Sequence, residues 1–105
     1  MAKAKIENFT QKEIQLSEIA KALAHPARVR ILNILFENNV CITGDIVDQL
    51  PLSQSTVSQH LVELKKVGLI KGEIEGQKTC YCLDNKIVES TKTLLNNLFS
   101  KICNC

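Results

Sequence analysis

The chain has 105 residues, of which 45% are hydrophobic and 23% are charged, and this length fits one domain and leaves no room for a second. The hydrophobic fraction is too high for a disordered chain, and no apolar run reaches the roughly 18 residues that a membrane span requires. The 13 Lys and Arg against 11 Asp and Glu leave a formal net charge of only +2, so any case for nucleic-acid binding depends on where the charges lie. We therefore expect a single folded domain over residues 1–105 with no membrane partner.

The N-terminal segment Met-Ala-Lys-Ala-Lys has neither the apolar core nor the small-residue cleavage site of a secretory signal, so we expect a cytoplasmic protein with reduced thiols. The five cysteines are odd in number: Cys41 stands apart, whereas Cys80 with Cys82 and Cys103 with Cys105 form two tight clusters. Such clusters are more typical of a ligand or redox set than of a disulfide framework.

The first part of the chain predicts two helices separated by a proline. Between Lys12 and Ala24, apolar residues recur at i, i+3, i+4 and i+7, which places them on one helical face. Proline disfavours helical geometry in the residue before it but suits the first turn of a helix, so a second helix should begin at Pro26. This helix, to about Glu37, is apolar around most of its circumference, and we expect it to be buried. We interpret His25 as a turn or packing residue.

A short strand and two further helices follow. Residues 40–42 favour β structure and predict a strand fragment, after which Thr43 can cap a short helix that runs to about Leu50. Ser53 can cap the next helix, which ends at Gly68, a residue free to take the left-handed conformation. Two helices joined by so short a connection predict a helix-turn-helix.

Two strand-like segments, 69–75 and 78–83, are joined by Gly-Gln and predict a two-stranded wing. Residues 86–103 carry apolar side chains at helical spacing and predict a long last helix. Its apolar stripe is broad for so small a domain, and oligomerisation adds burial that a short chain cannot find internally. The predicted fold is mainly α with a small β-hairpin (α+β), a winged helix-turn-helix that dimerises through its first and last helices.

The run 52–61, Leu-Ser-Gln-Ser-Thr-Val-Ser-Gln-His-Leu, is the most informative stretch. Short hydrogen-bonding side chains in the first half of a helix can reach base edges in a major groove, and amides at its start can meet phosphate. The alternative is that Ser53 is only a cap and that the rest is a solvated polar face. A preceding helix, Lys65 at the end of this helix, and Lys71 and Lys78 on the hairpin favour DNA binding.

Three blocks together resemble the ArsR/SmtB family of bacterial repressors: residues 21–32 (Lys-Ala-Leu-Ala-His-Pro-Ala-Arg-Val-Arg-Ile-Leu), residues 52–61, and the Gly-Leu-Ile at 68–70. The resemblance implies a homodimer that binds double-stranded operator DNA and releases it when an inducer, often a metal ion or metalloid, binds. It also implies that the helix after Ser53 is the recognition helix. Its DNA-facing side would then carry Gln54, Ser55, Thr56, Ser58, Gln59 and His60.

The sequence departs from the best-known inducer sites of that family. Where arsenic and cadmium sensors often carry Cys-Val-Cys-Asp, this chain has Ile42, Thr43 and Gly44 before Asp45, so both cysteines are absent. The Asp and His ligands that zinc sensors carry on the last helix are absent too, because both histidines of this chain lie upstream of it.

The cysteines suggest a different site. A winged helix usually pairs its short first strand with the returning strand of the wing, which would set Cys41 beside Cys80 and Cys82, and residues two apart on a strand share a face. We hypothesise that these three thiols bind arsenite, antimonite, zinc or cadmium, zinc with a fourth ligand. The alternative is that all three are buried or half-buried packing residues. Cys103 and Cys105 can join a sensing site or oxidise, or belong to a tail without function.

Other classes of protein fit less well. The sequence has no Gly-rich phosphate loop, nucleophile motif or obvious carboxylate pair, so we do not expect an enzyme. It has no Cys-x-x-Cys, which argues against a thioredoxin-like protein. Two alternatives stay open: a repressor of the same fold that senses oxidation or persulfide, and a metal or thiol buffer that does not bind DNA.

Overall fold

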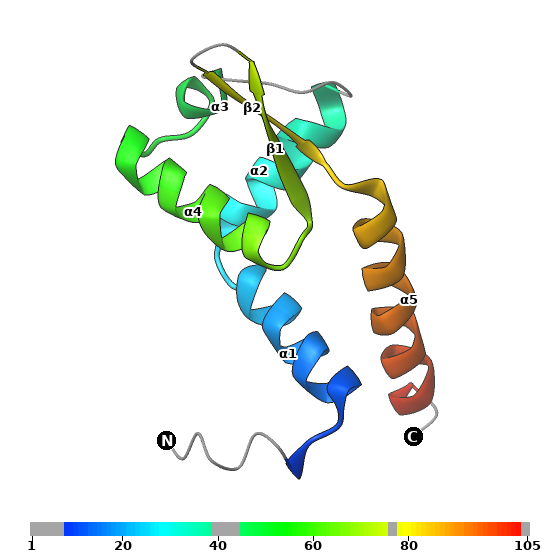
Figure 1. Cartoon of the computed structure of the whole chain (residues 1–105). Helices are drawn as coiled ribbons and strands as arrows, with labels where there is room; N and C mark the ends of the chain where they lie inside the picture. Colours follow the sequence, from blue (N-terminus) through cyan, green and yellow to red (C-terminus); the bar gives the residue numbers. More distant parts are fainter. Residues whose placement is uncertain (1–7, 39–44, 76–77, 104–105) are drawn as a thin grey trace.

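A computed structural model describes residues 8–38, 45–75 and 78–103. A short helix, a longer helix and an antiparallel hairpin gather at one end of the molecule, and the first and last helices extend toward the other end, where both termini lie (Figure 1). In chain order the elements are α1 (Gln11–Ala22), α2 (Pro26–Asn38), α3 (Asp45–Asp48), α4 (Gln54–Lys66), β1 (Ile70–Glu75), β2 (Lys78–Leu83) and α5 (Asn85–Ile102). This is the winged helix-turn-helix that the sequence predicts.

Local hydrogen bonds explain where the first two helices begin. Thr10 and Glu13 form a capping box: the Thr10 hydroxyl accepts from the Glu13 amide at 3.1 Å, and the Glu13 carboxylate accepts from the Thr10 amide at 2.9 Å. At the start of α2, Nδ1 of His25 accepts from the backbone amide of Ala27 at 3.0 Å. The interpretation of His25 as a turn residue is confirmed.

The boundaries of α4 also follow from its end residues. The Ser53 hydroxyl accepts from the Thr56 amide at 3.4 Å, as expected of an N-cap. After the helix, Gly68 has a φ of +83°, the left-handed conformation that ends many helices. The cap at Thr43 and the strand fragment at 40–42 lie outside the described residues.

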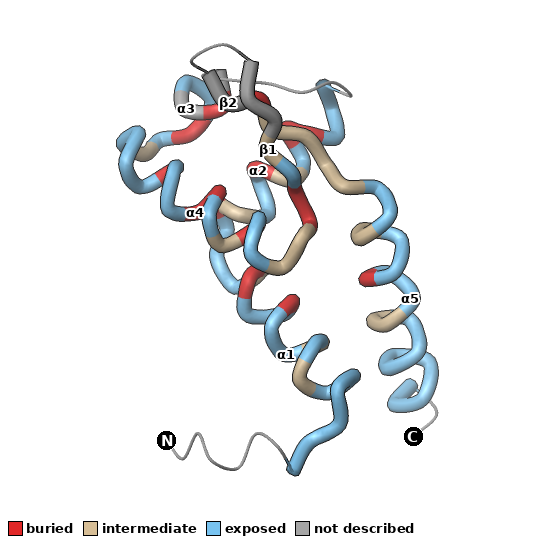
Figure 2. The backbone as a smooth tube through the Cα atoms, in the orientation of Figure 1, coloured by how far each residue is buried: buried red, intermediate tan, exposed pale blue. Residues whose placement is uncertain are grey.

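The core lies where α2, α3, α4 and β1 meet, and its most buried side chains are Ile31, Ile46, Val57, Leu64 and Ile70. Buried positions concentrate there, whereas α5 is largely exposed (Figure 2).

The expectation that α2 is buried holds for one side of the helix only. Val29 is 45% exposed and Phe36 is 71% exposed. Because these residues are seven apart, they share a helical face, and this face is turned away from the core against which Ile31, Ile34 and Leu35 pack.

The hairpin pairs Ile70 with Leu83 and Gly72 with Tyr81 in antiparallel register. Tyr81 and Leu83 pack against the core, so the base of the wing is fixed to the helical part of the domain.

The last helix begins at an Asp84 cap, whose carboxylate accepts from the Ile87 amide at 3.4 Å. It packs against α1, where Thr91 is buried, but its C-terminal half leaves Leu98, Phe99 and Ile102 exposed. Within the described part of the chain, no helix has the length and hydrophobicity needed to cross a membrane.

Candidate nucleic-acid interface

The helix α4 has two chemically distinct sides. Its buried side carries Val57, His60, Leu61 and Leu64. Its exposed surface at the N-terminal end consists of hydroxyl and amide side chains, namely Ser53, Gln54, Ser55, Thr56, Ser58 and Gln59, which we call the α4 polar surface. The apolar contacts on one side therefore present these groups to solvent on the other, as the sequence predicts for these six residues.

Hydroxyl groups interact with one another at the start of α4. The Ser53 and Thr56 hydroxyl oxygens lie 2.9 Å apart, and those of Ser53 and Ser55 lie 3.3 Å apart. A hydroxyl group can both donate and accept, so the cluster can offer either function to a partner. Such groups can meet phosphate oxygens or base edges.

The placement of His60 on this exposed surface is wrong. Its side chain is only 7% exposed, and its Nδ1 accepts from Nε of Arg28 at 3.1 Å. The His60 ring also lies 4.3 Å from that of His25, between ring centroids. Helical periodicity indicates this burial, because His60 is three residues after Val57 and four before Leu64, and both of these residues are buried.

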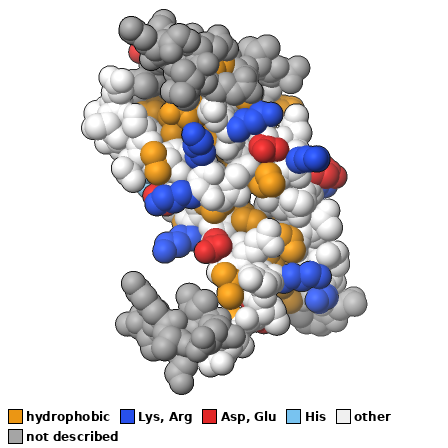
Figure 3. Space-filling model, in the orientation of Figure 1, with side chains coloured by type: hydrophobic (Ala, Val, Ile, Leu, Met, Phe, Trp, Pro, Cys, Tyr) orange, Lys and Arg blue, Asp and Glu red, His pale blue; other side chains and the backbone are white. Residues whose placement is uncertain are grey.

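The basic residues near this surface are dispersed. Lys65 and Lys71 are exposed, whereas the side chain of Lys78, on β2, lies outside the described residues. Lys66 pairs with Glu63 at 3.2 Å, an exposed ion pair. On the face shown in Figure 3, basic side chains are scattered among uncharged and acidic ones and form no continuous basic area.

The structure places three of the five cysteines. Cys80 is buried, at 4% exposure, Cys82 is half-buried two residues further along β2, and Cys103 is exposed after α5. Cys41 and Cys105 lie outside the described residues. No group of three Cys, His, Asp or Glu that could hold a metal occurs among the described side chains. The three-thiol site thus stays a prediction that depends on Cys41.

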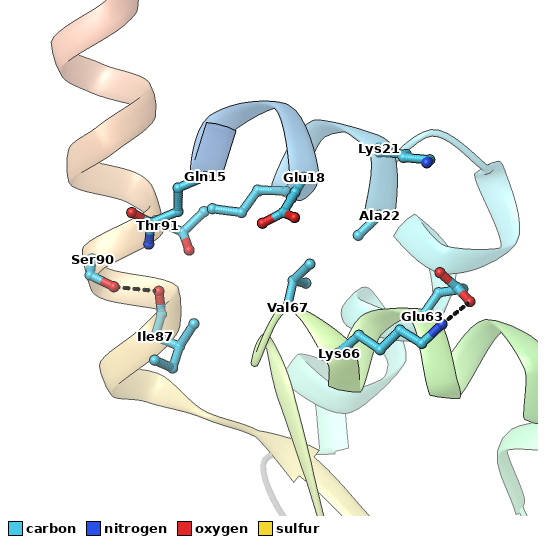
Figure 4. Close-up of a pocket in the computed structure, with 11 residues that line it drawn as sticks. Gln15, Glu18, Lys21, Ala22, Glu63, Lys66, Val67, Ile87, Ser90 and Thr91 are labelled. Atoms are coloured by element: carbon cyan, nitrogen blue, oxygen red, sulfur yellow. Dashed lines mark hydrogen bonds and ion pairs between the residues drawn. The ribbon is translucent and has the colours of Figure 1, made fainter. Parts of the chain in front are cut away.

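A groove of about 480 Å³ lies between α1, α4 and α5 (Figure 4). Its apolar floor includes Ile19, Val67 and Ile87, and the Glu63–Lys66 pair lies on the α4 side. The described residues that line it include no cysteine.

The chain is similar to known transcriptional regulators. The family model described as "Bacterial regulatory protein, arsR family" matches residues 25–71. The transcriptional repressor PagR of Bacillus anthracis is 36% identical over 80 residues, which cover 76% of this chain and 80% of PagR. The transcriptional activator HlyU of Vibrio cholerae is 36% identical over 81 residues, which cover 77% of this chain and 74% of HlyU. A solved structure of this HlyU aligns with a TM-score of 0.67 and 30% identity, covering 88% of this chain and 99% of that one.

The fold is a winged helix-turn-helix, and the proteins to which the chain is similar are transcriptional regulators, not enzymes. The chain belongs to the ArsR family of DNA-binding regulators, as its resemblance to ArsR/SmtB proteins implies. The names of its relatives include both a repressor and an activator, so family membership leaves the direction of regulation open.

Proposed function

We propose that this protein is a cytoplasmic homodimeric repressor that binds double-stranded operator DNA through α4 and leaves it when an inducer binds. The observation that carries this proposal is the division of α4 into a buried apolar side and the α4 polar surface. A helix of this kind, preceded by α3 and followed by the wing, has the arrangement by which helix-turn-helix proteins enter a major groove. Lys65 and Lys71, both exposed, would contact the phosphate backbone.

A second copy of the chain is the proposed partner. Phe9, just before α1, and Leu98, Phe99 and Ile102 on α5 are large exposed hydrophobic residues. Covering them in a two-fold dimer removes this apolar surface from water. A two-fold dimer would place two α4 helices on an inverted repeat, with half-sites about one helical turn apart.

We propose that the cysteines Cys41, Cys80 and Cys82 form the inducer sensor. The support for this proposal is the position of Cys80 and Cys82 at alternate residues of β2, where they pair with Glu73 and Lys71 of the neighbouring wing strand β1. Since β2 supplies only two thiols, a three-thiol site for a metal or metalloid beside it would need Cys41 as well. Thiolates favour soft ions, so the candidate inducers are arsenite, antimonite, zinc and cadmium.

Fluorescence anisotropy with the reduced protein and its own upstream DNA tests the proposal. Binding should weaken steeply as salt rises, and one of the four candidate inducers should release the DNA. Release by a mild oxidant alone would favour the redox or persulfide sensor instead. Tight metal binding without any DNA binding would favour the metal or thiol buffer and overturn the repressor.

The α4 polar surface has its own test. Replacing Gln54 and Gln59 with Ala should lower DNA affinity by about tenfold or more, since each lost hydrogen bond costs roughly 1 kcal/mol. Asn33→Ala, at an exposed position of α2, is the matched control and should bind as the wild type does. If the Gln54 and Gln59 variant binds DNA as tightly as Asn33→Ala, another surface contacts DNA.

A further inference from the structure

The side chain of Arg28 connects three helices. It extends from α2, and its Nη1 donates to the backbone carbonyls of Lys21 and Ala22, each at 3.3 Å, in the last turn of α1. Its Nε donates to Nδ1 of His60, on the buried side of α4, at 3.1 Å. The carbonyls at the end of a helix have no partner within it, so Arg28 caps α1 while holding α4.

The bond from Arg28 fixes the protonation state of His60. A guanidinium can only donate, so Nδ1 of His60 must accept and cannot carry a proton. His60 is therefore the neutral tautomer with its proton on Nε2. A second proton on Nδ1 would remove the acceptor and place two positive groups in contact.

The surroundings of His60 disfavour its charged form. Burial, followed by the charges of His25 and Arg28, lowers the pKa of His60 below its ordinary value of 6.5. On α4 itself, the Glu63 carboxylate is already paired with Lys66. Among the side chains that the structure describes, the other charged groups on the elements packed against α4 are Arg30 and Glu37 on α2, Asp48 on α3 and Lys71 on β1, and all four are exposed.

We propose that Arg28 is a positioning residue for DNA binding: it holds α4 against the end of α1 through neutral His60, so that protonation of His60 loosens α4 and weakens DNA binding. This inference rests on the proposed role of α4. Because α1 packs against α5, the same link sets the position of α4 relative to the helices proposed for dimerisation. DNA affinity thereby depends on His60, which lies on the buried side of α4 and not on the α4 polar surface.

The test is the pH dependence of DNA affinity at constant salt, from about pH 5 to pH 8, the range in which histidine titrates. The wild type should lose affinity by about tenfold as the pH falls below the ordinary value of 6.5. His60→Asn should give a flatter profile, because the Asn carbonyl can accept from Arg28 but does not titrate. A profile of His60→Asn that follows the wild type would overturn the inference.

A charge-matched pair tests Arg28 itself. Arg28→Lys keeps the positive charge but cannot donate to three acceptors in the same geometry, so its DNA affinity should fall at pH 7.5 and change less with pH. Arg30→Lys, at an exposed position of the same helix, should follow the wild-type profile. Equal behaviour of the two variants would contradict the positioning role.

Nuclear magnetic resonance of the wild type gives a measurement that needs no variant. The nitrogen shifts of His60 should show an unprotonated Nδ1 at neutral pH, and its titration should coincide with the loss of DNA affinity. A protonated Nδ1, or titration without any change in affinity, would overturn the inference. The double variant of Gln54 and Gln59 separates the two proposals. If it binds DNA as tightly as the wild type, the role of α4 is refuted. If His60→Asn keeps the wild-type pH profile, only the role of Arg28 is refuted.

Discussion

Gly68 and Ile87 lie against each other where α4 ends and the wing begins. A Cβ atom built on Gly68 would lie 3.4 Å from Cγ1 and Cγ2 of Ile87, at the edge of ordinary van der Waals contact. The φ of Gly68 is +83°, which is unfavourable for residues with a Cβ atom. The backbone conformation, more than the available space, thus requires glycine at this position.

Gly68→Ala should lower the free energy of unfolding by about 1 kcal/mol, because a left-handed conformation is strained for alanine. Gly68→Asn should lose less, since asparagine adopts this conformation more readily. Urea unfolding of the three proteins measures the difference. Wild-type stability of Gly68→Ala would contradict the explanation.

Two variants of Ser53 should separate stability from DNA binding. Ser53→Ala removes the cap of α4 and should cost about 1 kcal/mol of unfolding free energy. Ser53→Asp keeps a cap and should retain stability, but its negative charge would repel phosphate and weaken DNA binding. Thermal unfolding and anisotropy measure the two properties. If Ser53→Asp binds DNA as tightly as the wild type, the DNA phosphates do not lie near Ser53.

Two exposed phenylalanines make a matched pair for the dimer. Phe99→Glu, on the exposed part of α5, should give a monomer in sedimentation, because a carboxylate would be buried in the proposed interface. Phe36→Glu should leave the dimer intact, since Phe36 is more exposed but lies on α2. A dimeric Phe99→Glu protein would place the interface on another surface.

The thiol hypothesis predicts a protein that binds DNA but does not respond to inducer. Replacing Cys80 and Cys82 with Ala keeps small apolar side chains at these buried and half-buried sites and should abolish release by thiophilic ions. Cys103→Ser, at an exposed site, tests the alternative that the C-terminal thiols sense the inducer, and it should leave release intact. Full induction of the double variant by every ion that acts on the wild type would remove the hypothesis.

His60 should also make stability depend on pH. In the unfolded chain it takes up a proton near its ordinary pKa of 6.5, whereas the folded protein does so only at lower pH. The free energy of unfolding should therefore be highest above pH 6.5 and fall as the pH drops from 6.5 toward the lower folded pKa. In denaturant unfolding, the free energy of unfolding of His60→Asn should decline less than that of the wild type over that pH range. An equal decline in the two proteins would assign the effect to other groups.

Helix ends could be predicted from the sequence because their causes are local. The Ser53 hydroxyl caps α4 by accepting from the amide of Thr56, three residues later, and Gly68 ends the helix because its backbone takes a positive φ. The burial of His60 followed from the same periodicity that placed Val57 inward, but its polar side chain suggested an exposed position. Its partner, Arg28, is 32 residues away, and only the packing of α2 on α4 brings the two together. The exposure of Phe36 likewise depends on which side of α2 the core covers.

The hydroxyl cluster at the start of α4 has a consequence for the energetics of operator recognition. The Ser53 hydroxyl already hydrogen-bonds to the hydroxyls of Ser55 and Thr56, so a hydroxyl proton engaged in these bonds must leave them to meet a DNA acceptor. Exchange of one neutral hydrogen bond for another yields little net enthalpy. Calorimetry of operator binding should therefore show that these hydroxyl groups contribute little to the binding enthalpy. Base changes opposite them in the operator should be tolerated.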